Sequence, residues 1–147
     1  MSDEPKPIPP MALLLTAAGA LPFIGLAAIA VAGGPLPTHA QGALLTYGAV
    51  ILSFMGGIHW GFALTPLVRA APSHRLLLGV IPALIGWTAT LLPQNIGLCL
   101  LALAFAVLPG LDLAAIRTGA APSWYGRLRV PVTVVVVAAL LAASVAS

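Results

Sequence analysis

The sequence predicts an all-α integral membrane protein, a polytopic bundle of five transmembrane helices. Only six basic and three acidic residues occur in the 147-residue chain, and residues 7–68, 76–111 and 130–147 contain none of them. Because a helix that crosses a bilayer needs about 20 mostly apolar residues, these stretches accommodate two, two and one spans. A hydrophobic content of 61% and a mean hydropathy of +1.10 exclude a soluble domain, which needs a polar surface.

Glycine and proline divide the apolar stretches into individual helices. After a short polar tail, residues 1–10, a single domain of residues 11–147 is expected, with spans at residues 11–32, 43–64, 76–92, 96–116 and 129–147. Gly33-Gly34-Pro35 ends the first span, and Pro93-Gln94-Asn95 forms a tight turn between the third and fourth. Pro131 is expected in the first turn of the last span, where its missing N–H costs nothing.

Two segments need a choice between alternatives. The β-branched run of residues 132–137 is typical of a strand in water, but a lone strand in lipid leaves its backbone unpaired, so a helix is predicted. The first span is longer than the ~7–15 residues of a signal-peptide core and follows Asp3 and Glu4. It is therefore interpreted as a retained helix and not as a cleaved signal.

The arginines predict the orientation of the bundle. Arg69 and Arg75 lie in one expected connection and Arg117, Arg127 and Arg129 in another, whereas residues 33–42 and the turn at Pro93 contain no basic residue. Positive charge is enriched in cytoplasmic loops. The N-terminus is therefore expected inside and the C-terminus outside.

A row of small residues runs along the second span. Ala49, Ser53, Gly57 and Gly61 recur at four-residue spacing and so share one helix face, which would let another helix approach closely. The alternative is that glycine is simply common in membrane spans. We interpret the row as a packing ridge on a central helix.

His59 and Asp112 are ionisable residues at the inner ends of expected spans. They lie at similar depth, and Arg129 opens the fifth span at the same level. Ionisable groups in membranes are costly and usually pair with one another, so a polar cluster of His59, Asp112 and Arg129 is predicted. A purely structural role remains open: His59 as a neutral imidazole bonded to a free carbonyl, and Asp112 as a solvated counter-charge to loop arginines.

The other chemical signals are few. Trp124, Tyr125 and Arg127 are interpreted as an aromatic and basic anchor at the membrane interface, with an anionic lipid headgroup site as the alternative. His39 and His74 lie in loops on opposite sides, and Cys99 is the only cysteine, so no metal site or cofactor is expected. No catalytic motif is present, and the basic residues flank membrane segments, which argues against nucleic-acid binding.

Several segments carry a family resemblance. Residues 47–63 (YGAVILSFMGGIHWGFA), Leu21-Pro22-Phe23, Trp124-Tyr125, Leu128-Arg129 and Thr133 resemble the family of small membrane proteins that includes transmembrane protein 69. GGIHWG is the specific part, and the likeness covers nearly the whole chain. The resemblance implies a multi-span protein of a bacterial inner membrane or of mitochondria. It does not point to any particular activity.

Two functional hypotheses follow. The first is a non-enzymatic accessory or interaction protein of an inner membrane, mitochondrial if the protein is organellar. Its expected partners are the lipid bilayer together with other membrane proteins or a second copy of the chain. The alternative is a small transporter or proton-linked carrier with its polar site around His59 and Asp112. An enzyme acting on lipid or quinone is a more distant third.

Overall fold

Five helices make up most of the part of the chain that the structure describes. A computed structural model describes residues 7–33, 36–64 and 73–146. The helices are α1 (Pro10–Ala32), α2 (Pro37–Ala63), α3 (Ser73–Thr90), α4 (Gln94–Arg117) and α5 (Ser123–Ser144). The described residues contain no strand, and residues 132–137 are helical as predicted. The expected tail with Asp3, Glu4 and Lys6 lies largely outside the described residues, as does the connection with Arg69.

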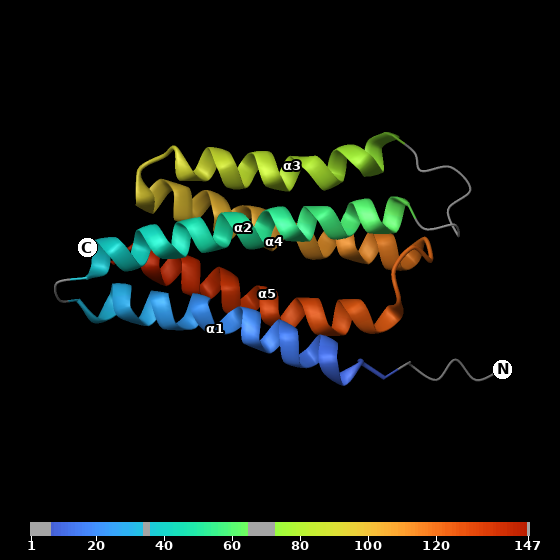
Figure 1. Ribbon diagram of the computed structural model, residues 1–147, viewed down its shortest axis with the longest axis horizontal. Coiled ribbons are helices and arrows are strands. Elements are labelled where there is room, and N and C mark those ends of the chain that lie inside the picture. The colour runs from blue at the N-terminus through green and yellow to red at the C-terminus, as the bar shows by residue number, and fades with distance from the viewer. Residues whose placement is uncertain (1–6, 34–35, 65–72, 147) are drawn as a thin grey trace.

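The helices run up and down along one long axis. Figure 1 shows each helix antiparallel to the next, with the start of α1 and the end of α5 at opposite ends of the bundle. Helix α2 lies in the middle and contacts all four other helices. Helix α3 packs on one side of α2 and α4, while α1 and α5 pack together on the other side. The core lies between these layers and includes Phe23, Leu44 and Phe105.

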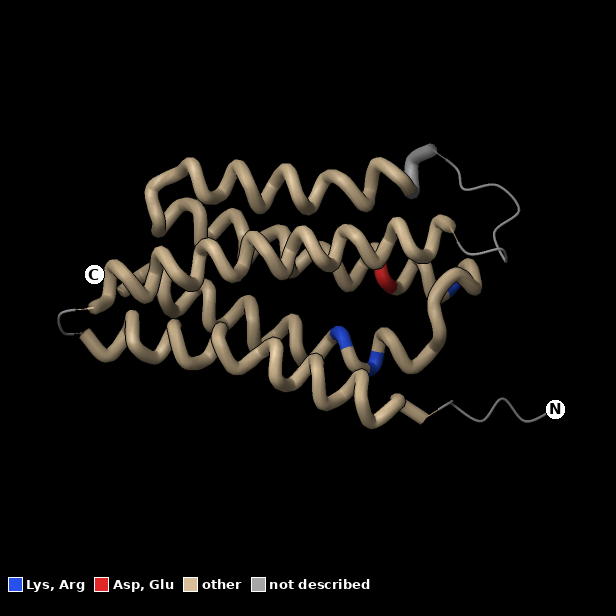
Figure 2. The backbone as a smooth tube through the Cα atoms, in the orientation of Figure 1, with Lys and Arg blue, Asp and Glu red and all other residues tan. Residues whose placement is uncertain are grey.

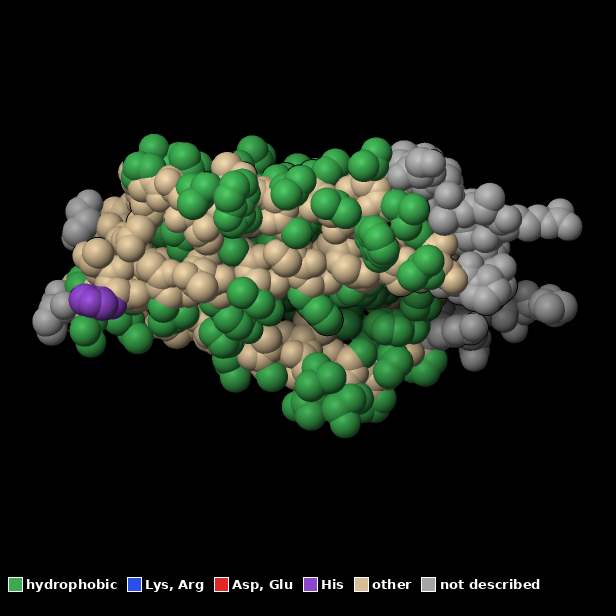
Figure 3. Space-filling model, turned by 45° about the horizontal axis from the view of Figure 1, so that its top comes forward, with side chains coloured by type: hydrophobic (Ala, Val, Ile, Leu, Met, Phe, Trp, Pro, Cys, Tyr) green, Lys and Arg blue, Asp and Glu red, His purple; other side chains and the backbone are tan. Residues whose placement is uncertain are grey.

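Four helices, α1, α2, α4 and α5, are long and apolar enough to cross a membrane. The apolar part described for α3, Leu76–Thr90, is shorter. Only 22% of the most apolar window of α1 is buried within the chain, so most of its hydrophobic side chains face outward. The face seen in Figure 3 carries hydrophobic side chains along its length. The protein is therefore an integral membrane protein, while five spans and their orientation stay predictions.

The ends of two helices differ from those predicted. Helix α2 begins at Pro37, a residue suited to a first turn, and not at residue 43. Helix α5 begins at Ser123, so Pro131 lies inside the helix and not in its first turn. The prediction treated the arginines as part of a loop, but Arg129 is buried against the neighbouring helix. Because the charge of Arg129 is paired with Asp112, this arginine can lie within a helix. Helix α5 therefore includes the segment that was expected to be a loop.

Four of the five described helices contain an internal proline. Pro22, Pro82, Pro109 and Pro131 lie inside α1, α3, α4 and α5. Each lacks an N–H and so leaves one helical carbonyl without its usual donor. Membrane helices tolerate this because neighbouring groups compensate. Two of these prolines lie close to buried charged residues. Pro109 comes three residues before Asp112, and Pro131 two residues after Arg129.

Candidate functional site

Three helices each contribute one residue to a buried charge cluster of His59, Asp112 and Arg129. Nε of Arg129 on α5 donates a hydrogen bond of 3.0 Å to Oδ2 of Asp112 on α4. Nε2 of His59 on α2 lies 3.1 Å from the other carboxylate oxygen, Oδ1. The structure thus brings together the three residues that the sequence placed at one depth. In Figure 2 the charged residues of the described part all lie toward the same end of the bundle.

The cluster is shielded from its surroundings. His59, Asp112 and Arg129 are 7%, 2% and 6% exposed. In such an environment the attraction between opposite charges is strong, but removing them from water costs several kcal/mol per ion. The cluster therefore adds little net stability, whereas loss of one partner would be costly. Its clearest effect is to fix α2, α4 and α5 relative to one another.

The contact of His59 differs in kind from that of Arg129. Its Nε2 is close to the carboxylate but is not aligned for a hydrogen bond and has no other hydrogen-bond partner. The imidazole ring packs edge to face on Phe62, with 5.8 Å between centroids, and Phe62 packs in the same way on Tyr125. Aromatic rings thus cover the cluster on one side, and a small ring rotation would complete the bond to Asp112.

Two further polar atoms near the cluster have no hydrogen-bond partner. They are Nη2 of Arg129 and Oγ1 of Thr133, which lies one helical turn further along α5. Thr133 is 7% exposed. Buried polar groups are normally satisfied, so unpaired ones mark a place that calls for an explanation. The sequence interpretation named Thr133 only as part of the family resemblance and did not select it as a site residue, because a threonine in an apolar helix does not by itself indicate a site.

Cavities adjoin the cluster on two sides. A space of about 180 Å³ borders His59, Phe62 and Thr118. Another, of about 200 Å³, borders Arg129 and Thr133. A wider groove between α4 and α5 also reaches Asp112 and Arg129. The cluster is therefore bordered by open spaces and is not enclosed by uniform packing.

The predicted ridge on α2 does not pack as a unit within the chain. Ala49 is buried and Ser53 half-buried, but Gly57 and Gly61 are exposed, and a Cβ on either would meet nothing within 4 Å. The close helix approach instead involves Gly56, where a Cβ would overlap the backbone carbonyl of Gly79 on α3. Because Gly56 and Gly57 are adjacent, the sequence alone does not show which of them faces a neighbouring helix. The position of α3 shows that it is Gly56.

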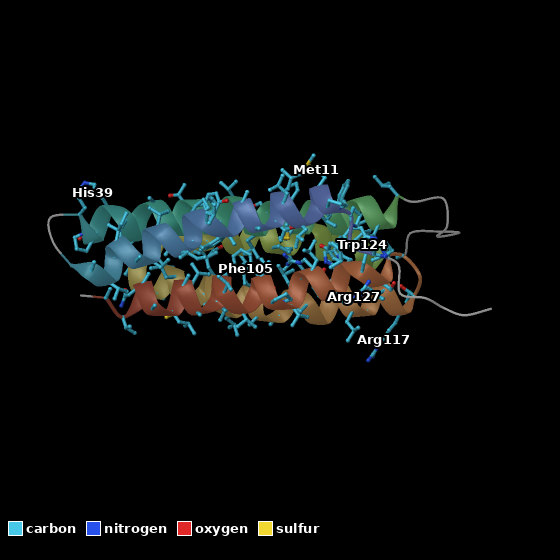
Figure 4. The ribbon with its side chains drawn as sticks, turned by 90° about the horizontal axis from the view of Figure 1, so that it is seen from below. Met11, His39, Phe105, Arg117, Trp124 and Arg127 are labelled. Carbon is cyan, nitrogen blue, oxygen red and sulfur yellow. The ribbon has the colours of Figure 1, made fainter. Side chains whose placement is uncertain are left out.

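The anchor residues lie at the cluster end of the bundle. Figure 4 shows Trp124, Arg127 and Arg117 there and His39 at the opposite end. Trp124 packs edge to face on Tyr125, with 6.2 Å between ring centroids, so the rings form a continuous series from Trp124 to His59. Arg127 is exposed. Within residues 7–33, 36–64 and 73–146, no three side chains of the kinds that bind metal ions gather at one place.

Comparison with known proteins identifies relatives but no activity. The chain is 36% identical to transmembrane protein 69 of Xenopus tropicalis over 96% of its length, and 31% identical to that of Mus musculus over 90%. These alignments cover 54% and 53% of the two relatives, so the chain spans about half their length. No solved structure matches it. Residues 8–145 match the family described as "Protein of unknown function (DUF3429)", and the chain belongs to this family of transmembrane proteins.

Proposed function

We propose that the chain is a non-enzymatic accessory or interaction protein of an inner membrane. The observation that carries the proposal is the position of Asp112 between two basic side chains. Both of its carboxylate oxygens lie within about 3 Å of a nitrogen from another helix, so each already has a basic partner within the chain. The charges thus serve to hold helices together, which is the function expected of a scaffold.

The same arrangement supports a role for the cluster as an internal clamp, which here means a contact that holds α2, α4 and α5 together. Asp112 links α4 to α2 and α5 at one end of the bundle, whereas the opposite end carries no described charge. Buried charges can fix a single arrangement of helices even where they contribute little net stability. A fixed outer surface is what binding to a membrane partner needs, and the partner is another membrane protein or a second copy of the chain.

The proposed orientation places the cluster end in the cytoplasm, or in the matrix of an organelle. It follows from five spans and from the arginines near that end. A phosphatase that is active only outside the cytoplasm should be active when fused after Ser147. A fluorescent protein that folds only inside should fluoresce when inserted between Gly119 and Ala120. A cytoplasmic C-terminus would contradict the predicted combination of five spans with the N-terminus inside.

A small carrier is the second candidate, favoured by the cavities on either side of the cluster. His59 borders one cavity and Arg129 another, so the ion pairs of Asp112 join residues that line two different spaces. Pro109 and Pro131 flank Asp112 and Arg129 and provide points at which α4 and α5 can bend. In this proposal the cluster is a gate and not a clamp.

Reconstitution distinguishes the two functions. For the accessory protein, liposomes containing the purified chain should show no more proton flux than empty liposomes when a pH gradient is applied. Gentle extraction of native membranes should then yield a stable complex with another membrane protein or a homo-oligomer. Flux that requires the protein and is lost in Asp112→Asn, but not in Arg117→Ala, would establish the carrier and refute the clamp.

A further inference from the structure

A cavity beside the charge cluster has an almost entirely apolar wall. It occupies about 200 Å³ among α1, α2, α4 and α5. Phe23, Met55 and Phe105 are among the hydrophobic residues that line it. Leu15 and Phe54 also belong to the wall and are 65% and 63% exposed, so the cavity reaches the outer, lipid-facing surface of the bundle. A hydrophobic molecule dissolved in the bilayer would therefore have access to it.

Two residues of this wall each have a hydrogen-bond donor that has no partner among the described residues. Nη2 of Arg129 and Oγ1 of Thr133 have no partner, and both residues line the cavity. Hydroxyl groups elsewhere in the bundle behave differently: those of Ser53 and Thr88 donate to the carbonyl four residues earlier. Thr133 forgoes this local bond. Both atoms are covered by neighbours, so a ligand would meet them after a small rotation of the side chains.

The charges of the cluster limit the kind of ligand. The carboxylate of Asp112 already balances the guanidinium of Arg129. A second anion in this apolar space would lack a counter-charge and would be costly to bury. An uncharged oxygen that accepts hydrogen bonds from Thr133 and Arg129 has no such cost. The ligand thus combines an apolar body with a neutral acceptor.

The size of the cavity suits a ring. An engineered protein cavity of about 150 Å³ with apolar walls stays dry and binds benzene. The present cavity is somewhat larger and is lined by aromatic rings, which favour stacking or edge contacts with another ring. A substituted six-membered ring fits this space better than a phospholipid headgroup, which is larger and charged.

We propose that this cavity binds the carbonyl-bearing ring of a lipid-soluble molecule of the quinone class. The ring lies among the apolar side chains, and one carbonyl oxygen accepts hydrogen bonds from Thr133 Oγ1 and Arg129 Nη2. The hydrophobic tail leaves between Leu15 and Phe54 into the bilayer. This inference does not depend on whether the charge cluster acts as a clamp or as a gate.

Thr133→Val tests the proposal because it removes the hydroxyl and keeps the shape of the side chain. We expect purified Thr133→Val protein in detergent to bind a decyl-substituted benzoquinone about five- to tenfold more weakly than the unmodified chain, in line with the loss of one hydrogen bond. Its thermal stability without ligand should be unchanged or higher, since an unpartnered buried hydroxyl is lost. Thr88→Val, outside the cavity, is the control and should bind normally.

Two further measurements make the outcome decisive. Decylbenzene has a six-membered carbon ring and the same tail but no carbonyl oxygens, and we expect it to bind at least tenfold more weakly than the quinone. Ala20→Leu fills the cavity and should abolish quinone binding even if Thr133→Val fails to fold. Equal binding of decylbenzene and the quinone, or full binding by Thr133→Val or Ala20→Leu, would overturn the proposal.

Discussion

Asp112→Asn is expected to lower the free energy of unfolding by about 3 to 5 kcal/mol, the usual cost of breaking a buried ion pair on one side. The amide removes the charge but keeps the shape, so the loss reports on the charge itself. Arg129 would then be a buried cation at 6% exposure with no anion beside it. Unfolding of the detergent-solubilised protein with increasing amounts of a denaturing detergent measures the change.

A double-mutant comparison shows whether the loss comes from the pair. Arg129→Met should cost about as much as Asp112→Asn, since it leaves the buried carboxylate without the arginine that balances its charge. The double variant should cost clearly less than the sum of the two, because both members of the pair are then neutral. Arg117→Ala, an exposed arginine on α4, is the matched control and should change stability by less than about 1 kcal/mol. Strictly additive losses would show that Asp112 and Arg129 do not interact.

Gly56→Leu is expected to be the most damaging single substitution between α2 and α3. A Cβ at this position overlaps the carbonyl oxygen of Gly79 and comes within 3.3 Å of Pro82. Backbone atoms cannot rotate away as a side chain can, so the two helices must separate. We expect a loss of more than about 3 kcal/mol, beyond the usual range for an overpacked core, and little folded protein after extraction.

The adjacent residue provides a matched control. Gly57→Leu adds the same side chain one residue further along α2, where a Cβ meets nothing within 4 Å. Its yield of monodisperse protein on size-exclusion chromatography should therefore remain close to that of the unmodified chain. If Gly57→Leu were the damaging variant and Gly56→Leu the tolerated one, the packing face of α2 would be the ridge predicted from the sequence.

Much of the fold could be predicted because lipid imposes a simple requirement. Each apolar stretch must satisfy its own backbone hydrogen bonds, so charge-free stretches and their glycine and proline breaks locate the helices. The start of α5 could not be found in this way. Its arginines indicated a loop, and only the position of Asp112 on another helix explains how Arg129 can be buried.

The candidate site was partly predictable for a similar reason. Depth along the spans placed His59, Asp112 and Arg129 at one level, but it could not give the rotation of each helix. The structure shows that all three side chains turn inward. Rotation also decides whether Gly56 or Gly57 meets α3, and it depends on the shape of the facing helix. Thr133 was named only as part of the family resemblance, because its unpartnered hydroxyl can be seen only in the structure.

The order in which the cluster residues are synthesised affects assembly of the protein. Asp112 precedes Arg129 by 17 residues, and Arg129 belongs to the last helix. A nascent chain that has inserted only its first four helices therefore holds a carboxylate with His59 as its only cluster partner. Since a carboxylate that lacks its arginine is costly in a membrane, this intermediate should be the least stable stage of insertion. Arrival of the fifth helix completes the pair, so chains truncated before residue 129 are expected to be degraded rapidly.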